Sequence, residues 1–132
     1  MNGTGIITIP SGNGMTDTVN RVEMMVKSKG LTAFTTIDHA AGIKDVGMPL
    51  APTFLLIFGN AKGGTRLMNA RQDVGIDLPL NVLVWQDSAG RVWLTDNDPG
   101  WIAKRHGLGH EVDPNVEAVR DALATITTEA AR

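Results

Sequence analysis

The chain has 132 residues, of which 42% are hydrophobic and 20% are charged, and its formal net charge is -2 at pH 7. This length and composition fit a single domain, residues 1–132, with a core of its own. The small net charge and the scattered basic residues, without interleaved aromatic residues, argue against a nucleic-acid surface. The absence of cysteine excludes disulfides and cysteine-ligated metal sites.

No apolar stretch approaches the length of a membrane span, and residues 1–10 lack the basic start and apolar run of a signal peptide. We therefore expect a soluble, cytoplasmic protein with no membrane contact. A leader peptide that had been removed would leave no trace in this sequence.

The first part of the chain predicts two strands with a helix between them. Isoleucines within residues 4–9 indicate a strand, and valines at helical spacing over residues 19–26 indicate a helix that ends at Gly30. A second strand follows over residues 31–38. Residues 39–51 form a connection that is long for a small domain, a length that favours a binding loop.

The middle of the chain predicts three further strands. Residues 54–58 are apolar on both faces and indicate an interior strand. A glycine-rich, basic segment and a short helix ending before Gly75 come next. Strands over residues 80–86 and 91–95 are joined by a tight hairpin at residues 87–90.

Two helices are predicted at the C-terminal end. Asp98 and Asp113 are each followed by proline, which marks a helix start with a capping carboxylate. The first helix ends at Gly107, and the second carries an apolar stripe that can cover a sheet. This order predicts an α+β fold: a two-layer sandwich of a mainly antiparallel sheet with helices on one face.

The glycine-rich segment after the third strand is the most suggestive feature for binding. Glycines let a backbone approach a ligand, and a helix beginning near Thr65 would favour an anion at its N-terminus. Thr65 stands where a P-loop requires lysine, so nucleotide hydrolysis is not expected. The alternative is a flexible turn with solvated charges. The candidate ligand-binding residues here are Asn60, Lys62, Gly63, Gly64, Thr65 and Arg66.

Three histidines are candidates for chemistry. His39 follows the second strand, and His106 lies near the end of a short helix, so we consider each as a catalytic acid or base. A metal site would need His39, His106, His110 and Glu111 to converge through tertiary contact, and their spacing does not indicate one, so no metal is predicted. The alternative for His106 is a basic side chain that stabilises a helix C-terminus.

Five motifs follow one another along the chain: Ile37–Gly42, Pro52–Asn60, Gly64–Met68, Gly75–Leu80 and Asn97–Pro99. In this order they resemble the motifs of the domain-of-unknown-function family 302. Arg105-His106 fits the same pattern, whereas Ala61 replaces a usual proline and Asp96 a common aromatic residue. The resemblance implies an antiparallel sheet backed by helices, similar to the TATA-binding-protein-like architecture, and often a dimer. It implies no established reaction, substrate or cofactor.

Three functions follow as hypotheses. The first is a homodimeric module that binds a small, anionic ligand between the His39 loop, the Gly59–Arg66 segment and the Asn97–His106 segment. Asp98 belongs to this site as a ligand-binding candidate, although its local sequence favours a helix cap. The second is an enzyme that uses His39 or His106 as acid or base. The third is an assembly protein whose tryptophans and methionines form a subunit interface. Neither a reaction nor a cofactor is specified by the sequence.

Overall fold

A computed structural model describes residues 3–44 and 47–132 of the chain, and its sheet has the strand order β1-β5-β4-β3-β2. Every neighbouring pair of strands is antiparallel. The strands are β1 (Ile6–Pro10), β2 (Thr32–Asp38), β3 (Thr53–Gly59), β4 (Leu80–Gln86) and β5 (Val92–Asn97). The predicted α+β architecture with an antiparallel sheet is confirmed.

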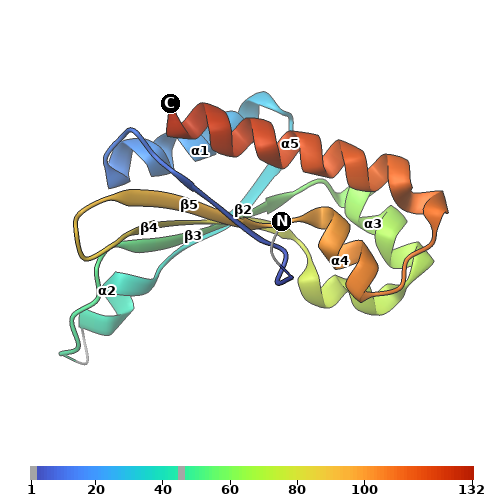
Figure 1. Cartoon of the computed structure of the whole chain (residues 1–132), viewed down its shortest axis with the longest axis horizontal. Coiled ribbons are helices and arrows are strands. Elements are labelled where there is room, and N and C mark those ends of the chain that lie inside the picture. The colour runs from blue at the N-terminus through green and yellow to red at the C-terminus, as the bar shows by residue number, and fades with distance from the viewer. Residues whose placement is uncertain (1–2, 45–46) are drawn as a thin grey trace.

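Two long helices cover one face of this sheet, and shorter helices lie at its two ends (Figure 1). The long helices are α1 (Met15–Ser28) and α5 (Asp113–Ala131). The shorter elements are α2 (His39–Lys44), α3 (Ala61–Ala70), α4 (Pro99–Arg105) and the 3-10 segments η1 (Gln72–Asp77) and η2 (His110–Val112). None of the helices in these described ranges combines the length and apolarity needed to cross a bilayer.

The main core lies between the sheet and the pair α1 and α5. Alternate strand residues such as Leu56, Val82 and Leu94 meet Val22 of α1 and Ile126 of α5, and all of them are almost completely buried. Side chains along a strand alternate between the two faces. The intervening residues therefore point away from α1 and α5, onto a face that the helices leave uncovered.

The strand predicted over residues 54–58 is interior, because β3 lies between β2 and β4. Its burial differs from the prediction on one face. Leu56 and Phe58 are buried under the helices, whereas Leu55 and Ile57 are only partly buried on the open face. An apolar run on both faces requires two covering layers, and this fold supplies one.

Two helix starts agree with the sequence, and one differs. Asp98 caps α4 by accepting a hydrogen bond from the Gly100 N–H at 3.0 Å. The second predicted helix, α5, begins at Asp113 as expected, but the Asp113 carboxylate pairs with His110 and does not cap the helix, so the predicted cap is wrong. The helix expected near Thr65 begins at Ala61, because Asn60 Oδ1 accepts from the Lys62 N–H at 2.9 Å and so caps it earlier.

The long connection after β2 begins with α2, and the strand register decides where that helix lies. Asp38 at the end of β2 pairs with Phe54 at the start of β3, whereas Thr32 pairs with Gly59 at the end of β3. α2 and its first residue, His39, are therefore at the opposite end of the sheet from the glycine-rich segment (Figure 1).

Candidate functional site

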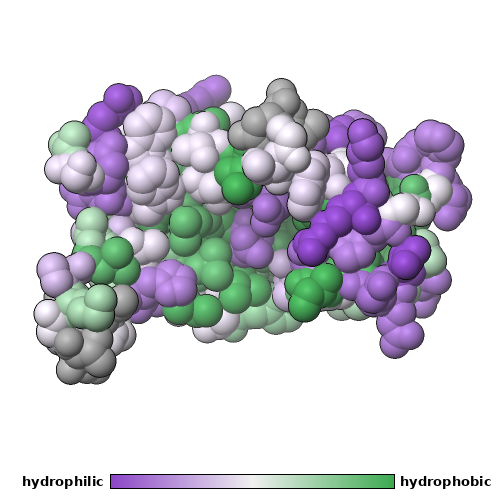
Figure 2. All heavy atoms as spheres, turned by 60° about the horizontal axis from the view of Figure 1, so that its bottom comes forward, coloured by the Kyte–Doolittle hydropathy of each residue, from purple (hydrophilic) through white to green (hydrophobic). Residues whose placement is uncertain are grey.

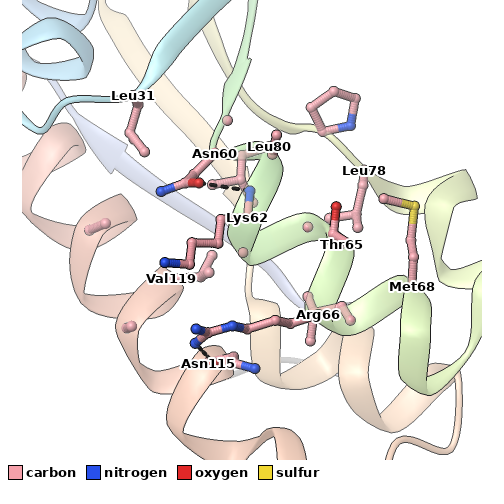
Figure 3. Close-up of a pocket in the computed structure, with 18 of the residues that line it drawn as sticks. Leu31, Asn60, Lys62, Thr65, Arg66, Met68, Leu78, Leu80, Asn115 and Val119 are labelled. Atoms are coloured by element: carbon pink, nitrogen blue, oxygen red, sulfur yellow. Dashed lines mark hydrogen bonds between the residues drawn. The ribbon is translucent and has the colours of Figure 1, made fainter.

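A pocket of about 660 Å³ opens between α3 and α5, where β3 ends and β4 begins (Figure 3). Volumes of this size are typical of pockets for small molecules. Its residues come from the start of β2, the turn after β3, most of α3, the approach to β4 and the middle of α5. They are Leu31, Phe34, Gly59, Asn60, Ala61, Lys62, Gly63, Gly64, Thr65, Arg66, Leu67, Met68, Gly75, Leu78, Pro79, Leu80, Asn115, Ala118, Val119 and Ala122.

The polar side chains of the pocket gather toward α5. Lys62 and Arg66 are four residues apart on α3 and extend toward that helix (Figure 3). Arg66 Nη1 donates to Asn115 Oδ1 at 3.3 Å and so joins α3 to α5. The ammonium of Lys62 has no partner among the described residues. Nor is there a carboxylate among the described residues that line the pocket, so its electrostatic character is positive.

The remainder of the wall is largely hydrocarbon. Leu31 and Leu80 lie toward the sheet, Val119 on α5, and Leu78 and Met68 on the other side of α3 (Figure 3). Burying hydrocarbon against such surfaces is favourable by roughly 25 cal/mol per Å². The pocket therefore has one cationic side and a larger apolar part.

Gly63 lies where a side chain would enter the pocket. A Cβ added there would meet nothing within 4 Å, whereas one at Gly64 would lie 3.8 Å from the methyl carbon of Met68. Neither glycine has a positive φ, so their backbone does not require glycine. Glycine in a helix costs up to about 1 kcal/mol relative to alanine. In return the missing side chains leave the pocket open beside α3.

Sequence reasoning placed part of this lining and missed the rest. All six candidates from Asn60 to Arg66 line the pocket. The contribution of α5 was missed, since its apolar stripe was assigned wholly to covering the sheet. A signal was present in the small residues Ala118 and Ala122, which are four apart and leave space on one face of α5.

Asp98 does not line the pocket and is only 3% exposed. Besides capping α4, its Oδ1 accepts from Arg120 Nε of α5 at 3.1 Å. Asp96 lies nearby on the helix side of β5 and is 7% exposed. Burial, and secondly the charge of Asp98, raises the pKa of Asp96 to about 6. These two carboxylates therefore belong to the core beside the pocket.

His106 takes part in an ion cluster that joins α4 to η1. Its Nε2 donates to Asp77 Oδ2 at 2.6 Å, and Arg105 Nη1 lies 3.0 Å from both oxygens of the same carboxylate. The ring and the carboxylate are mostly buried. A histidine held in this way has a clear structural task, because it fixes the short helix against the segment before β4.

His39 is not near this cluster. It begins α2 at the far end of β3, and its ring has no hydrogen-bond partner among the described residues. The expectation that the His39 loop, the glycine-rich segment and the Asn97–His106 segment meet over one end of the sheet is therefore wrong for His39. The two histidines cannot share a pocket, because the length of the sheet separates them.

The remaining histidine, His110, is exposed and pairs with Asp113 at 3.0 Å. This hydrogen bond, together with the Asp113 charge, raises the pKa of His110. Over residues 3–44 and 47–132, no three histidine, aspartate or glutamate side chains are grouped so that they could hold a metal ion.

The chain is similar in sequence to longer proteins and in fold to a solved structure. It is 44% identical over 128 residues to proteins of Brucella suis and Brucella abortus, each named "Fluoride-specific ion channel FluC 1". The match covers 97% of this chain but 50% and 47% of those proteins, so the chain spans about half the length of the curated relatives it matches.

A solved structure, that of an uncharacterized conserved protein DUF302 from Bacillus stearothermophilus, has the same fold. Its TM-score is 0.85 at 19% identity, and the alignment covers 97% of this chain and 98% of that one. The model of the domain of unknown function DUF302 matches residues 7–128. The chain therefore belongs to the DUF302 family.

Proposed function

We propose that this chain is a binding module that takes a small anionic ligand in the pocket between α3 and α5. The observation that carries the proposal is the unpaired ammonium of Lys62, which lies beside Arg66 in a pocket whose described lining holds no carboxylate. Like charges four residues apart on a helix repel by a few tenths of a kcal/mol. A bound anion would remove that repulsion and supply the missing counter-charge.

Thermal unfolding in the presence of an anion panel tests the proposal. Acetate, citrate, inorganic phosphate and organic carboxylates are compared at constant ionic strength, because surface charge effects depend on salt. At least one is expected to raise the melting temperature, since a ligand that binds only the folded state stabilises it. Lys62→Ala should abolish most of that shift. Lys104→Ala, an exposed helical lysine outside the pocket, and His39→Ala should keep it.

Fluoride belongs in this panel because the two Brucella relatives are named as fluoride-specific ion channels. Small ions are strongly hydrated, and removing them from water requires many close partners. A wide, largely apolar pocket offers few of these, so we expect fluoride to give no stabilisation beyond that of chloride. If fluoride alone raises the melting temperature and Lys62→Ala removes that rise, the ligand at these residues is a halide and the proposed organic anion is wrong.

A catalytic role that joins His39 and His106 is not proposed again. The two rings lie at opposite ends of the sheet, and His106 is engaged by Asp77. General acid–base catalysis needs its groups within hydrogen-bond reach of one substrate.

Homodimer formation through the open face of the sheet is a second proposal, and a separate observation favours it. The apolar residues of the open face are Ile37, Leu55, Ile57, Leu83, Trp85 and Trp93, and the polar residues Thr35, Asn81 and Thr95 lie on the same face. Figure 2 shows apolar residues gathered across the middle of the molecule as seen from this side. None of these six side chains is charged, although the Arg91 guanidinium lies over the Trp93 ring, 4.8 Å from its centroid. An apolar patch of this kind is typical of an interaction surface.

The tryptophans give the open face a defined shape. Trp85 and Trp93 are paired across β4 and β5, with ring centroids 6.1 Å apart in a stacked arrangement. Their N–H groups are satisfied within the chain, by Thr95 at 2.8 Å and by Asp87 at 2.9 Å. The rings therefore offer apolar area with little side-chain entropy left to lose, as is usual at interfaces.

Light scattering over a range of protein concentrations tests the dimer. The wild type is expected to have twice the monomer mass, and Leu55→Lys should shift it to the monomer. Met24→Lys places the same charge on α1, where Met24 is 67% exposed, and should leave the mass unchanged. A wild type that stays monomeric at high concentration would reject this assembly while leaving the pocket proposal intact.

A further inference from the structure

We infer that the ligand is an amphipathic carboxylate, with one anionic head and a hydrocarbon body. This inference rests on the proposed anion site and adds the class of ligand. The pocket of about 660 Å³ is far larger than a phosphate or an acetate requires. An ion of that size would leave the apolar walls in contact with water. A hydrocarbon body removes this water and so contributes most of the binding free energy.

The helical period places the charged and apolar parts of α3 on different stripes. Lys62 and Arg66 share one stripe and extend toward α5, whereas Gly64 and Met68 share another that meets Leu78 (Figure 3). Gly63 lies between the two stripes, and apart from its chain neighbours and the backbone of its own helix, no atom of the described residues lies within 4 Å of the position of a Cβ there. The open space beside Gly63 thus connects the cationic side to the apolar part.

Arg66 favours a carboxylate as the head group. Among the described residues, its guanidinium makes one hydrogen bond, from Nη1 to Asn115 Oδ1, which fixes its direction and leaves Nε and Nη2 unused. Those two N–H donors on one edge match the two oxygens of a carboxylate. Lys62 supplies a second positive charge on the same stripe. Asn60 uses its Oδ1 as the helix cap, so its amide nitrogen remains available as a donor.

Calorimetric titration with three probes separates the head from the body. Dodecanoate, below its micelle concentration, carries both, dodecanol carries the body alone, and acetate carries the head alone. Dodecanoate is expected to bind at one site per chain, dodecanol about tenfold more weakly and acetate not measurably. The expected factor follows from one charge-assisted hydrogen bond, since 1.4 kcal/mol corresponds to tenfold in affinity.

Two sets of variants assign this binding to the pocket. Arg66→Ala and Lys62→Ala should each weaken dodecanoate by part of the roughly tenfold effect of the whole head group and leave dodecanol unchanged. Gly63→Leu should fill the connecting space and abolish both. Gly42→Leu is the matched control. Gly42 also lies in a helix, and a Cβ added there would meet nothing within 4 Å, but it is at the other end of the sheet. Ala122→Leu fills the pocket from α5, should Gly63→Leu fail to fold.

The tryptophans report any binding elsewhere. Within residues 3–44 and 47–132 no tryptophan lines the pocket, whereas Trp85 and Trp93 lie on the open face. Dodecanoate in the pocket should leave the fluorescence of these rings unchanged, and a large change that persists in Gly63→Leu would overturn the inference. If small organic anions bind and dodecanoate does not, the anion site stands and the ligand class is wrong. If no probe and no anion binds, both proposals fail.

Discussion

Arg120 Nε of α5 donates to Asp98 Oδ1 of α4 at 3.1 Å, and the same oxygen accepts the Gly100 N–H. One buried carboxylate therefore both starts a helix and joins it to the helix that covers the sheet. Its contribution to the site is indirect, because it fixes α5, whose other residues form the pocket wall.

Replacement of Asp98 should destabilise the protein. Asp98→Ala removes a helix cap, worth about 1 kcal/mol, and a charge-assisted hydrogen bond of roughly 1.5 kcal/mol or more. We expect a loss of about 2 to 3 kcal/mol in urea unfolding. Asp98→Asn keeps an oxygen that can cap and should cost about half as much. Equal losses for the two variants would show that the charge, rather than the cap, carries the effect.

Asp96 predicts an unusual dependence of stability on pH. Its pKa is raised from 3.8 to about 6, so the folded state holds this proton more tightly than the unfolded chain does. The free energy of unfolding should therefore fall as pH rises from about 4 to above 6, by on the order of 2 kcal/mol from this group. Asp96→Asn should be more stable than wild type at pH 8, with the advantage shrinking below pH 6 and absent near pH 4. Urea unfolding across this range measures it, and a pH-independent difference would contradict the assignment.

Gly5 should not tolerate a side chain. Its φ is 71°, and a Cβ there would lie within 2.6 Å of three Trp101 carbon atoms. Gly107 has a similar φ of 64° with nothing within 4 Å, which makes it the matched control. We expect Gly107→Ala to cost about 1 kcal/mol from backbone strain alone. Gly5→Ala should cost about 3 kcal/mol, because overpacking adds to the strain. Equal losses in thermal unfolding would mean that Trp101 moves aside freely.

Trp93 should control the ionisation of Asp87. The Trp93 Nε1–H bond to Asp87 Oδ2 and, next, the Arg91 backbone N–H hold the pKa of Asp87 below its ordinary value. Trp93→Phe removes the indole donor, so this pKa should rise toward the ordinary value in a carboxyl NMR titration. Trp85→Phe is the control, because Trp85 donates to Thr95. A rise of similar size in both variants would point to a general loosening of the hairpin.

The sequence predicted most of the elements, because the relevant signals are local. Apolar periodicity located the strands and the last helix, and Asp98 before a proline identified the start of α4. The segment after β3 was predicted to be a binding region from its glycines and cations, and all of its candidates line the pocket. Asp113 before a proline likewise identified the start of α5, but its carboxylate pairs with His110 and makes no cap.

What the chain determines by itself is which residues prefer strand, helix or turn, since that preference depends on neighbours within a few positions. The tertiary structure decided which segments meet. The antiparallel register of β2 on β3 sends His39 to one end of the sheet and Gly59 to the other, although both border strands of the same pair. Packing of α5 across the sheet then brought Asn115 and Val119 to Lys62, an encounter between residues more than fifty positions apart that no local pattern encodes.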